Sequence, residues 1–189
     1  KLFSVNLVTG TMTFIGSAGV VLIAPFFLQN VLDFSAQKAG ALLTVVPIAM
    51  GVVAPLAGRL SDRYGKKLFL AAGLLLYVMA AAGYLWAPGF RWLFLFRLLS
   101  GAGAAMVIPT AYAYIGDLTP PGREGRYMGI FNIAMVGGYG IGPTLGGLVY
   151  DAYGMDAAFA SMCIMASVGF LVVLLLLPSG TRPPGTSPV

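Results

Sequence analysis

Long apolar runs, separated by short stretches that carry nearly all of the charge, dominate this chain of 189 residues. A helix needs about 20 mostly apolar residues to cross the hydrocarbon layer of a bilayer. We place six such spans at about 3–28, 38–59, 67–87, 90–115, 126–149 and 157–177. The alternating pattern of membrane β-strands is missing from the sequence. The pattern therefore predicts an all-α membrane protein, with one six-helix unit over residues 1–178 and a Pro-rich cytoplasmic tail over 179–189.

The composition supports an integral membrane protein. Hydrophobic residues make up 59% of the chain and charged residues 9%, whereas a soluble domain has about 45–50% and about 25%. A single cysteine rules out a disulfide framework, and histidine is absent. We therefore expect no cofactor and no metal site. The net charge of +5 is spread between apolar runs, which favours contact with lipid headgroups rather than nucleic acid.

Lysine and arginine in the loops predict the orientation, because they are enriched on the cytoplasmic side. Two of them, Lys38 and Arg91, fall on one side of the predicted membrane. Eight fall on the other: Lys1, Arg59, Arg63, Lys66, Lys67, Arg123, Arg126 and Arg182. This imbalance predicts a plasma (inner) membrane protein with both termini in the cytoplasm.

Two pairs of segments indicate an internal repeat. GVVLIAP at 19–25 and GAAMVIP at 103–109 share Gly and Pro at the same spacing. PLAGRLSDRYG at 55–65 and PTLGGLVYDAYG at 143–154 align with one inserted residue. Each unit is three helices long, so the second copy must run through the membrane in the opposite sense. Inverted three-plus-three repeats are typical of secondary transporters.

The most charged stretch, GRLSDRYGKK at 58–67, is predicted to be the cytoplasmic loop between the second and third spans. Its glycines, Gly58 and Gly65, allow close approach and a tight turn. Asp62 can accept hydrogen bonds from the N-terminal amides of a neighbouring helix. We expect Arg59 and Arg63 to pair with Asp62 or with Asp117 at the end of the fourth span. We expect Lys66 and Lys67 to fix topology and to bind headgroups.

Arg97 lies inside the fourth span, about 9 Å deeper along the helix than Arg91. An arginine at that depth must face protein or water, or snorkel to the interface. We interpret it as a cation lining a cavity, where it contacts substrate or tunes a proton-carrying carboxylate. In the fifth span, Gly138, Gly142 and Gly146 share one face that permits close packing, and Pro143 bends the helix.

Further candidates for a substrate cavity are polar residues within the spans: Asn6, Gln29, Tyr112 and Asn132. The six carboxylates, at positions 33, 62, 117, 124, 151 and 156, all lie at predicted helix ends or in loops. If transport is coupled to protons, the proton site is then in the other half, at Asp33 near the outer surface, or absent.

Three motifs carry a resemblance to the major facilitator superfamily. Residues 58–70 resemble its signature loop, G-x-L-x-D-R-x-G-R-K-x-x-L, with Lys66 in place of Arg. RLLSGAGAA at 97–105, with Gly101 and Gly103, is similar to the family's fourth-helix pattern. GYGIGPTLGG at 138–147, which includes Gly147, resembles the fifth-helix motif of the antiporter branch. PFFLQNVL at 25–32 resembles drug-efflux members.

The resemblance implies that such a charged cluster latches the cytoplasmic side, where we favour Asp62 and Arg63 as the latch residues, and that the fifth helix lies at a gating interface. It also implies twelve or fourteen helices in two halves, so six spans correspond to one half. The Pro-rich tail favours the C-terminal half, and the fifth-helix motif favours the N-terminal half. A second six-helix half, in the same polypeptide or another copy, is the expected partner.

The favoured function is proton-coupled efflux of small amphipathic compounds by alternating access. The alternatives are an uptake transporter for a small metabolite and a non-transporting membrane scaffold of the same fold. An enzyme is disfavoured, because the sequence lacks histidine, clustered cysteine and paired carboxylates within its spans.

Overall fold

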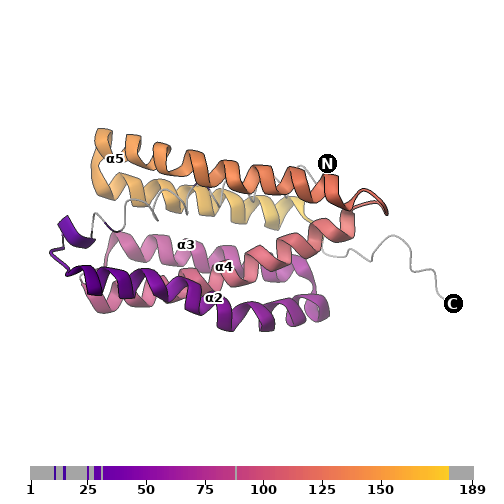
Figure 1. Ribbon diagram of the computed structural model, residues 1–189, viewed down its shortest axis with the longest axis horizontal. Coiled ribbons are helices and arrows are strands. Elements are labelled where there is room, and N and C mark those ends of the chain that lie inside the picture. Colours follow the sequence, from indigo (N-terminus) through magenta and orange to yellow (C-terminus); the bar gives the residue numbers. More distant parts are fainter. Residues whose placement is uncertain are drawn as a thin grey trace.

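The chain forms a bundle of long helices (Figure 1). The computed structural model describes residues 11, 15, 25, 28–30, 32–87 and 89–178. Within them it contains α2 (Ala36–Tyr64), α3 (Lys66–Leu85), α4 (Phe90–Leu118) and α5 (Glu124–Leu176). All four are long and apolar enough to cross a membrane. The expected first span falls almost wholly outside the described residues, as does the tail, so the count of six spans stays a prediction.

The longest helix, α5, is two helices that meet at Gly154, whose φ of 82° and ψ of −176° are not helical. Figure 1 shows its two limbs, orange and yellow, folded back side by side. These limbs account for the spans expected at 126–149 and 157–177. Only glycine adopts this backbone conformation readily, so the sharp reversal depends on Gly154.

The stretch at 58–67 is not the loop that the sequence predicted. α2 continues through Tyr64, and Gly65 alone separates it from α3. No Gly or Pro lies between Gly58 and Gly65, so nothing stops the helix. Its charged side chains, Arg59, Asp62 and Arg63, are exposed. Gly65 ends α2 with a φ of 103° and a ψ of 130°, while its N–H donates to the Ser61 carbonyl at 3.0 Å.

The two glycines that the proposed repeat aligns, Gly65 and Gly154, therefore make the same kind of turn. Both have a positive φ and both join two helices with no further loop. The aligned prolines, Pro55 and Pro143, both lie inside helices. The internal repeat itself stays a prediction, because the segment at 19–25 lies almost wholly outside the described residues.

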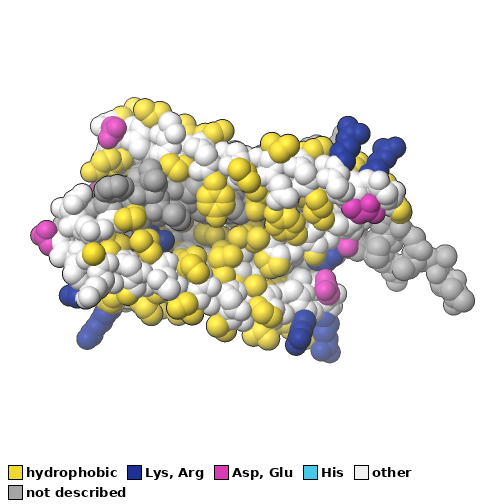
Figure 2. Space-filling model, in the orientation of Figure 1, with side chains coloured by type: hydrophobic (Ala, Val, Ile, Leu, Met, Phe, Trp, Pro, Cys, Tyr) yellow, Lys and Arg dark blue, Asp and Glu magenta, His cyan; other side chains and the backbone are white. Residues whose placement is uncertain are grey.

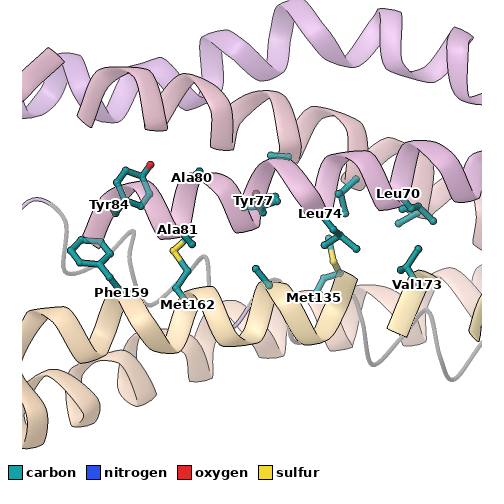
Figure 3. Packing of buried hydrophobic residues seen from close by; sticks show 14 of the residues in the cluster. Leu70, Leu74, Tyr77, Ala80, Ala81, Tyr84, Met135, Phe159, Met162 and Val173 are labelled. Carbon is teal, nitrogen blue, oxygen red and sulfur yellow. The ribbon is translucent and has the colours of Figure 1, made fainter. Parts of the chain in front are cut away.

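The described core consists of α4 packed against α2 and α3, and of α3 packed against α5. Figure 3 shows side chains of α3 facing side chains from both limbs of α5. The labelled ones are Leu70, Leu74, Tyr77, Ala80, Ala81 and Tyr84 on α3, and Met135, Phe159, Met162 and Val173 on α5. Figure 2 shows hydrophobic side chains along the sides of the bundle and charged side chains towards its two ends. That distribution suits a bundle surrounded by lipid.

Candidate functional site

A charged cluster joins the start of α3 to the end of α4. The Lys66 ammonium lies 2.5 Å from Oδ2 of Asp117 and 3.9 Å from Oδ1 of Asp62. It also donates to the carbonyl oxygen of Ala113 at 3.1 Å. The Lys66 side chain is 14% exposed and that of Asp117 27%, whereas that of Asp62 is 69% exposed. The strong pair is therefore Lys66–Asp117, and Asp62 lies at its solvent-facing side.

This geometry differs from the expected pairing of Arg59 and Arg63. Both arginines are exposed, and in the part of the chain that the structure describes neither lies within ion-pair distance of a carboxylate. The Arg63 guanidinium lies instead over the ring of Tyr64, 5.5 Å from its centroid. The reason is that Arg59 and Arg63 lie on the exposed side of the last turns of α2. Lys66 follows the turn at Gly65 and is directed towards α4.

The helix ends favour the position of the Lys66 ammonium. As the first residue of α3, Lys66 lies at the positive end of its own helix dipole, which is unfavourable for a cation. Its ammonium reaches the last two turns of α4, where it contacts Asp117 and the Ala113 carbonyl. A cation at a helix C-terminus is stabilised by the unpaired carbonyls and by the dipole. Lys66 thus has a structural partner, contrary to the expectation that it serves only topology.

Arg97 is buried at 8% exposure on α4. Its guanidinium carbon lies 5.8 Å from the ring centroid of Tyr84 on α3. The Tyr84 hydroxyl lies 3.3 Å from Oγ of Ser100, which donates to the Arg97 carbonyl at 2.9 Å. The burial is inconsistent with a side chain that snorkels to the interface. Tyr84 and Ser100 were not among the sequence candidates, since nothing in the local sequence links a tyrosine on α3 to Arg97.

The fourth-helix glycines let α4 pack closely on both of its neighbours. A Cβ on Gly101 would lie 2.7 Å from Cβ of Ala49 and 3.0 Å from the Val46 carbonyl oxygen, both on α2. A Cβ on Gly103 would lie 2.8 Å from the carbonyl oxygen of Gly73 on α3. The two glycines thus act as packing positions, one towards each neighbouring helix.

The fifth-helix motif occupies the first limb of α5. Gly138 and Gly142 are buried, whereas Gly146 and Gly147 are partly exposed. Pro143 lies within the helix, where its missing N–H leaves one carbonyl without its usual partner. The buried pair is consistent with close helix packing, and a role in gating remains a proposal.

The polar cavity candidates are only partly brought together. The Tyr112 hydroxyl donates to Oδ1 of Asn132 at 2.5 Å, linking α4 to α5. Gln29 is exposed, and Asn6 lies outside the described residues. Among the residues that the structure describes, no cluster of His, Cys, Asp or Glu could hold a metal ion.

Comparison with known proteins agrees with this architecture. Residues 7–188 match the family model of the Major Facilitator Superfamily. The chain is 35% identical over 149 residues to an uncharacterized MFS-type transporter of Methanocaldococcus jannaschii, covering 78% of this chain and 39% of that protein. It is 30% identical over 145 residues to a multi-drug resistance efflux pump PmrA homolog of Lactococcus lactis, covering 77% of this chain and 36% of that protein.

The fold also matches a crystal structure of the peptide transporter POT in complex with alafosfalin, with a TM-score of 0.85 at 18% identity. That match covers 96% of this chain and 40% of POT. The chain thus spans about two fifths of the length of the proteins that it matches. The family match and the relatives named as multidrug efflux pumps agree with the resemblance to the drug/proton antiporter branch. The chain belongs to the Major Facilitator Superfamily.

Proposed function

We propose that this chain is part of a secondary active transporter that exports small amphipathic compounds by alternating access, in exchange for protons. Export is supported by the efflux-pump relatives. The second six-helix half would come from the same polypeptide or from another copy. The proposed location is the plasma membrane, with both termini in the cytoplasm. The proton acceptor would be Asp33 or a carboxylate of the second half.

The observation that carries this proposal is the Lys66–Asp117 pair. Alternating access needs contacts that hold one state and can break to reach the other. A fully exposed ion pair contributes about 0–1 kcal/mol, and removing one partner of a buried pair costs about 3–5 kcal/mol. At 14% and 27% side-chain exposure, this pair lies between those limits. It is strong enough to bias a two-state equilibrium and weak enough to open during a transport cycle.

The cluster therefore acts as a latch between the α2–α3 turn and the end of α4. Lys66 is its cation, and Asp117 and the Ala113 carbonyl are its acceptors. Asp62, which is more exposed and more distant from Lys66, contributes less to this pair. Its role is a contact with the second half, where it would cap the N-terminus of a facing helix.

The test is transport by the purified protein in proteoliposomes under an imposed proton gradient, with ethidium as a cationic probe and 2-naphthalenesulfonate as an anionic probe. Lys66→Gln and Asp117→Asn should each slow transport of the probe that the wild type moves by several-fold, and the double variant should be no slower than either single one. Lys66→Arg should retain most of the rate, because it can still pair with Asp117. Lys67→Gln is the matched control, since Lys67 is adjacent and has no carboxylate partner among the described residues.

Two results would count against the proposal. Correctly inserted wild-type protein that moves neither probe when a proton gradient is imposed would favour a non-transporting scaffold. Normal exchange by both Lys66→Gln and Asp117→Asn would remove the ion pair from the mechanism.

A further inference from the structure

The described part of the chain buries one charged side chain within a span, and that side chain is a cation. Arg97 is 8% exposed, and both ion pairs in the described residues belong to Lys66 rather than to Arg97. A buried guanidinium without a counter-charge is costly. Its position therefore calls for a partner that these residues do not supply.

Carboxylates of the chain are badly placed to be that partner. All six acidic residues lie at or near helix ends. Asp151 and Asp156, on either side of Gly154, are exposed and not within ion-pair distance of Arg97. The chain therefore offers a buried positive charge to a bound molecule and no buried negative one.

The surroundings of Arg97 hold its guanidinium in place without using its hydrogen-bond donors. The Tyr84 ring lies against it, and this ring is itself fixed by Phe96 at 6.0 Å, by Phe159 at 5.5 Å and by the hydroxyl contact with Ser100. A ring face attracts a cation but accepts no directional N–H bond of the kind a carboxylate accepts. The planar fork of N–H donors stays available, in apolar aromatic surroundings.

We propose that Arg97, supported by Tyr84, binds an oxyanion: the carboxylate or a similar acidic group of an amphipathic compound. The guanidinium fork matches two carboxylate oxygens, and the aromatic side chains around it suit an apolar body. This inference names a substrate class for the function proposed above. Binding alone tests it, whether or not the protein transports.

The experiment compares two probes with the same ring system and opposite charge, 2-naphthoate and 2-naphthylmethylammonium. Binding is measured by equilibrium dialysis on the purified protein in phosphatidylcholine nanodiscs. The wild-type protein should bind 2-naphthoate at least about tenfold more tightly, which is the range that a charge-assisted hydrogen bond supplies. Arg97→Gln should lose about tenfold or more in 2-naphthoate affinity.

Arg91→Gln is the matched control, because Arg91 is an exposed arginine six residues earlier on the same helix. Its affinity for 2-naphthoate should equal that of the wild type. Since Arg97→Gln could fail to fold, a second measurement uses wild-type protein alone. 2-Naphthoate should raise its thermal unfolding midpoint and 2-naphthylmethylammonium should not, because a ligand stabilises the state that binds it.

Equal binding of the two probes by the wild type would overturn the inference, as would unchanged 2-naphthoate affinity in folded Arg97→Gln. A lipid headgroup is the other source of an oxyanion. Replacing part of the phosphatidylcholine with phosphatidylglycerol should leave 2-naphthoate affinity unchanged. Weaker 2-naphthoate binding in phosphatidylglycerol would show that the lipid headgroup occupies the site instead. Selective 2-naphthoate binding without transport would support the oxyanion site and refute the proposed transport function. Transport without selective binding would support the transport function and refute the oxyanion site.

Discussion

Gly103→Ala is expected to separate α3 from α4. The new Cβ would lie 2.8 Å from the Gly73 carbonyl oxygen and 3.2 Å from Cδ2 of Tyr77, whereas ordinary contact begins near 3.4 Å. The carbonyl belongs to the backbone of a packed helix and cannot rotate away. The two helices must therefore move apart by about 0.6 Å at this point, and such overpacking costs about 1–3 kcal/mol.

The gain in helix propensity acts in the opposite direction. Alanine is favoured over glycine in a helix by up to about 1 kcal/mol. The net loss of unfolding free energy for Gly103→Ala is then about 0–3 kcal/mol relative to wild type. Gly51→Ala on α2 is the matched control, because nothing lies within 4 Å of its added Cβ. Gly51→Ala should raise the free energy of unfolding by up to about 1 kcal/mol. The free energies of unfolding of the two variants should therefore differ by about 1–3 kcal/mol.

The measurement is equilibrium unfolding of the purified protein in mild detergent, followed by helical circular dichroism as a denaturing detergent is added. Comparing the two variants cancels the propensity term and leaves the packing term. If Gly103→Ala is as stable as Gly51→Ala, the close approach of α3 and α4 does not limit stability and the reasoning is refuted.

Gly65→Ala should lower the free energy of unfolding by about 1–3 kcal/mol in the same assay, because a side chain is strained at a φ of 103°. No atom lies within 4 Å of the added Cβ, so the loss would report backbone strain alone. If Gly58→Ala, inside α2, gives the same free energy of unfolding, the strain argument is wrong. Gly154→Ala, at a φ of 82°, should lose a similar amount, and an unchanged unfolding midpoint would show that the turn tolerates a side chain. In a double-mutant cycle, Tyr112→Phe and Asn132→Leu should show a coupling free energy of about 0.5–1.5 kcal/mol, because the Tyr112–Asn132 hydrogen bond links α4 to α5. Strictly additive effects of the two substitutions would argue against that hydrogen bond.

Helix positions followed from the sequence because the apolar runs leave no other way to satisfy the backbone in a membrane. The end of α2 could not be predicted in this way, because its polar last turns resemble a loop in composition. Arg59 and Asp62 continue the helix, and only Gly65 interrupts it. The alignment of Gly65 with Gly154 was a better guide, because a required positive φ selects glycine at both positions.

The pairing of charges could be predicted only in part. Arg59 and Arg63 were expected to pair with Asp62 or Asp117, whereas the residue that pairs with Asp117 is Lys66. The four-residue spacing of Asp62 and Lys66 was a usable signal, since it permits the 3.9 Å approach across the turn. Which basic residue reaches Asp117 depends on the rotation of α3 relative to α4, and local sequence does not contain that information.

The packing of Arg97 against Tyr84 could not be predicted from the sequence for a similar reason. The depth of Arg97 could be counted along its helix, but the contact depends on how α3 and α4 cross. The close glycine positions Gly73 and Gly103 set that crossing, and their proximity becomes visible only when both helices are placed.

The one-residue joint at Gly65 has a consequence for how the chain tolerates insertions and deletions. Each residue added to a helical segment rotates the rest of the helix by about 100° and shifts it by about 1.5 Å. One extra residue in α3 between Lys66 and Leu70 would rotate Lys66 relative to Leu70 and Leu74, so the pair with Asp117 and the packing against α5 could not both be kept. A stretch that looks like a variable surface loop should thus keep its length more strictly than its composition. Homologous sequences with a gap at this point would be expected to use a different ion pair.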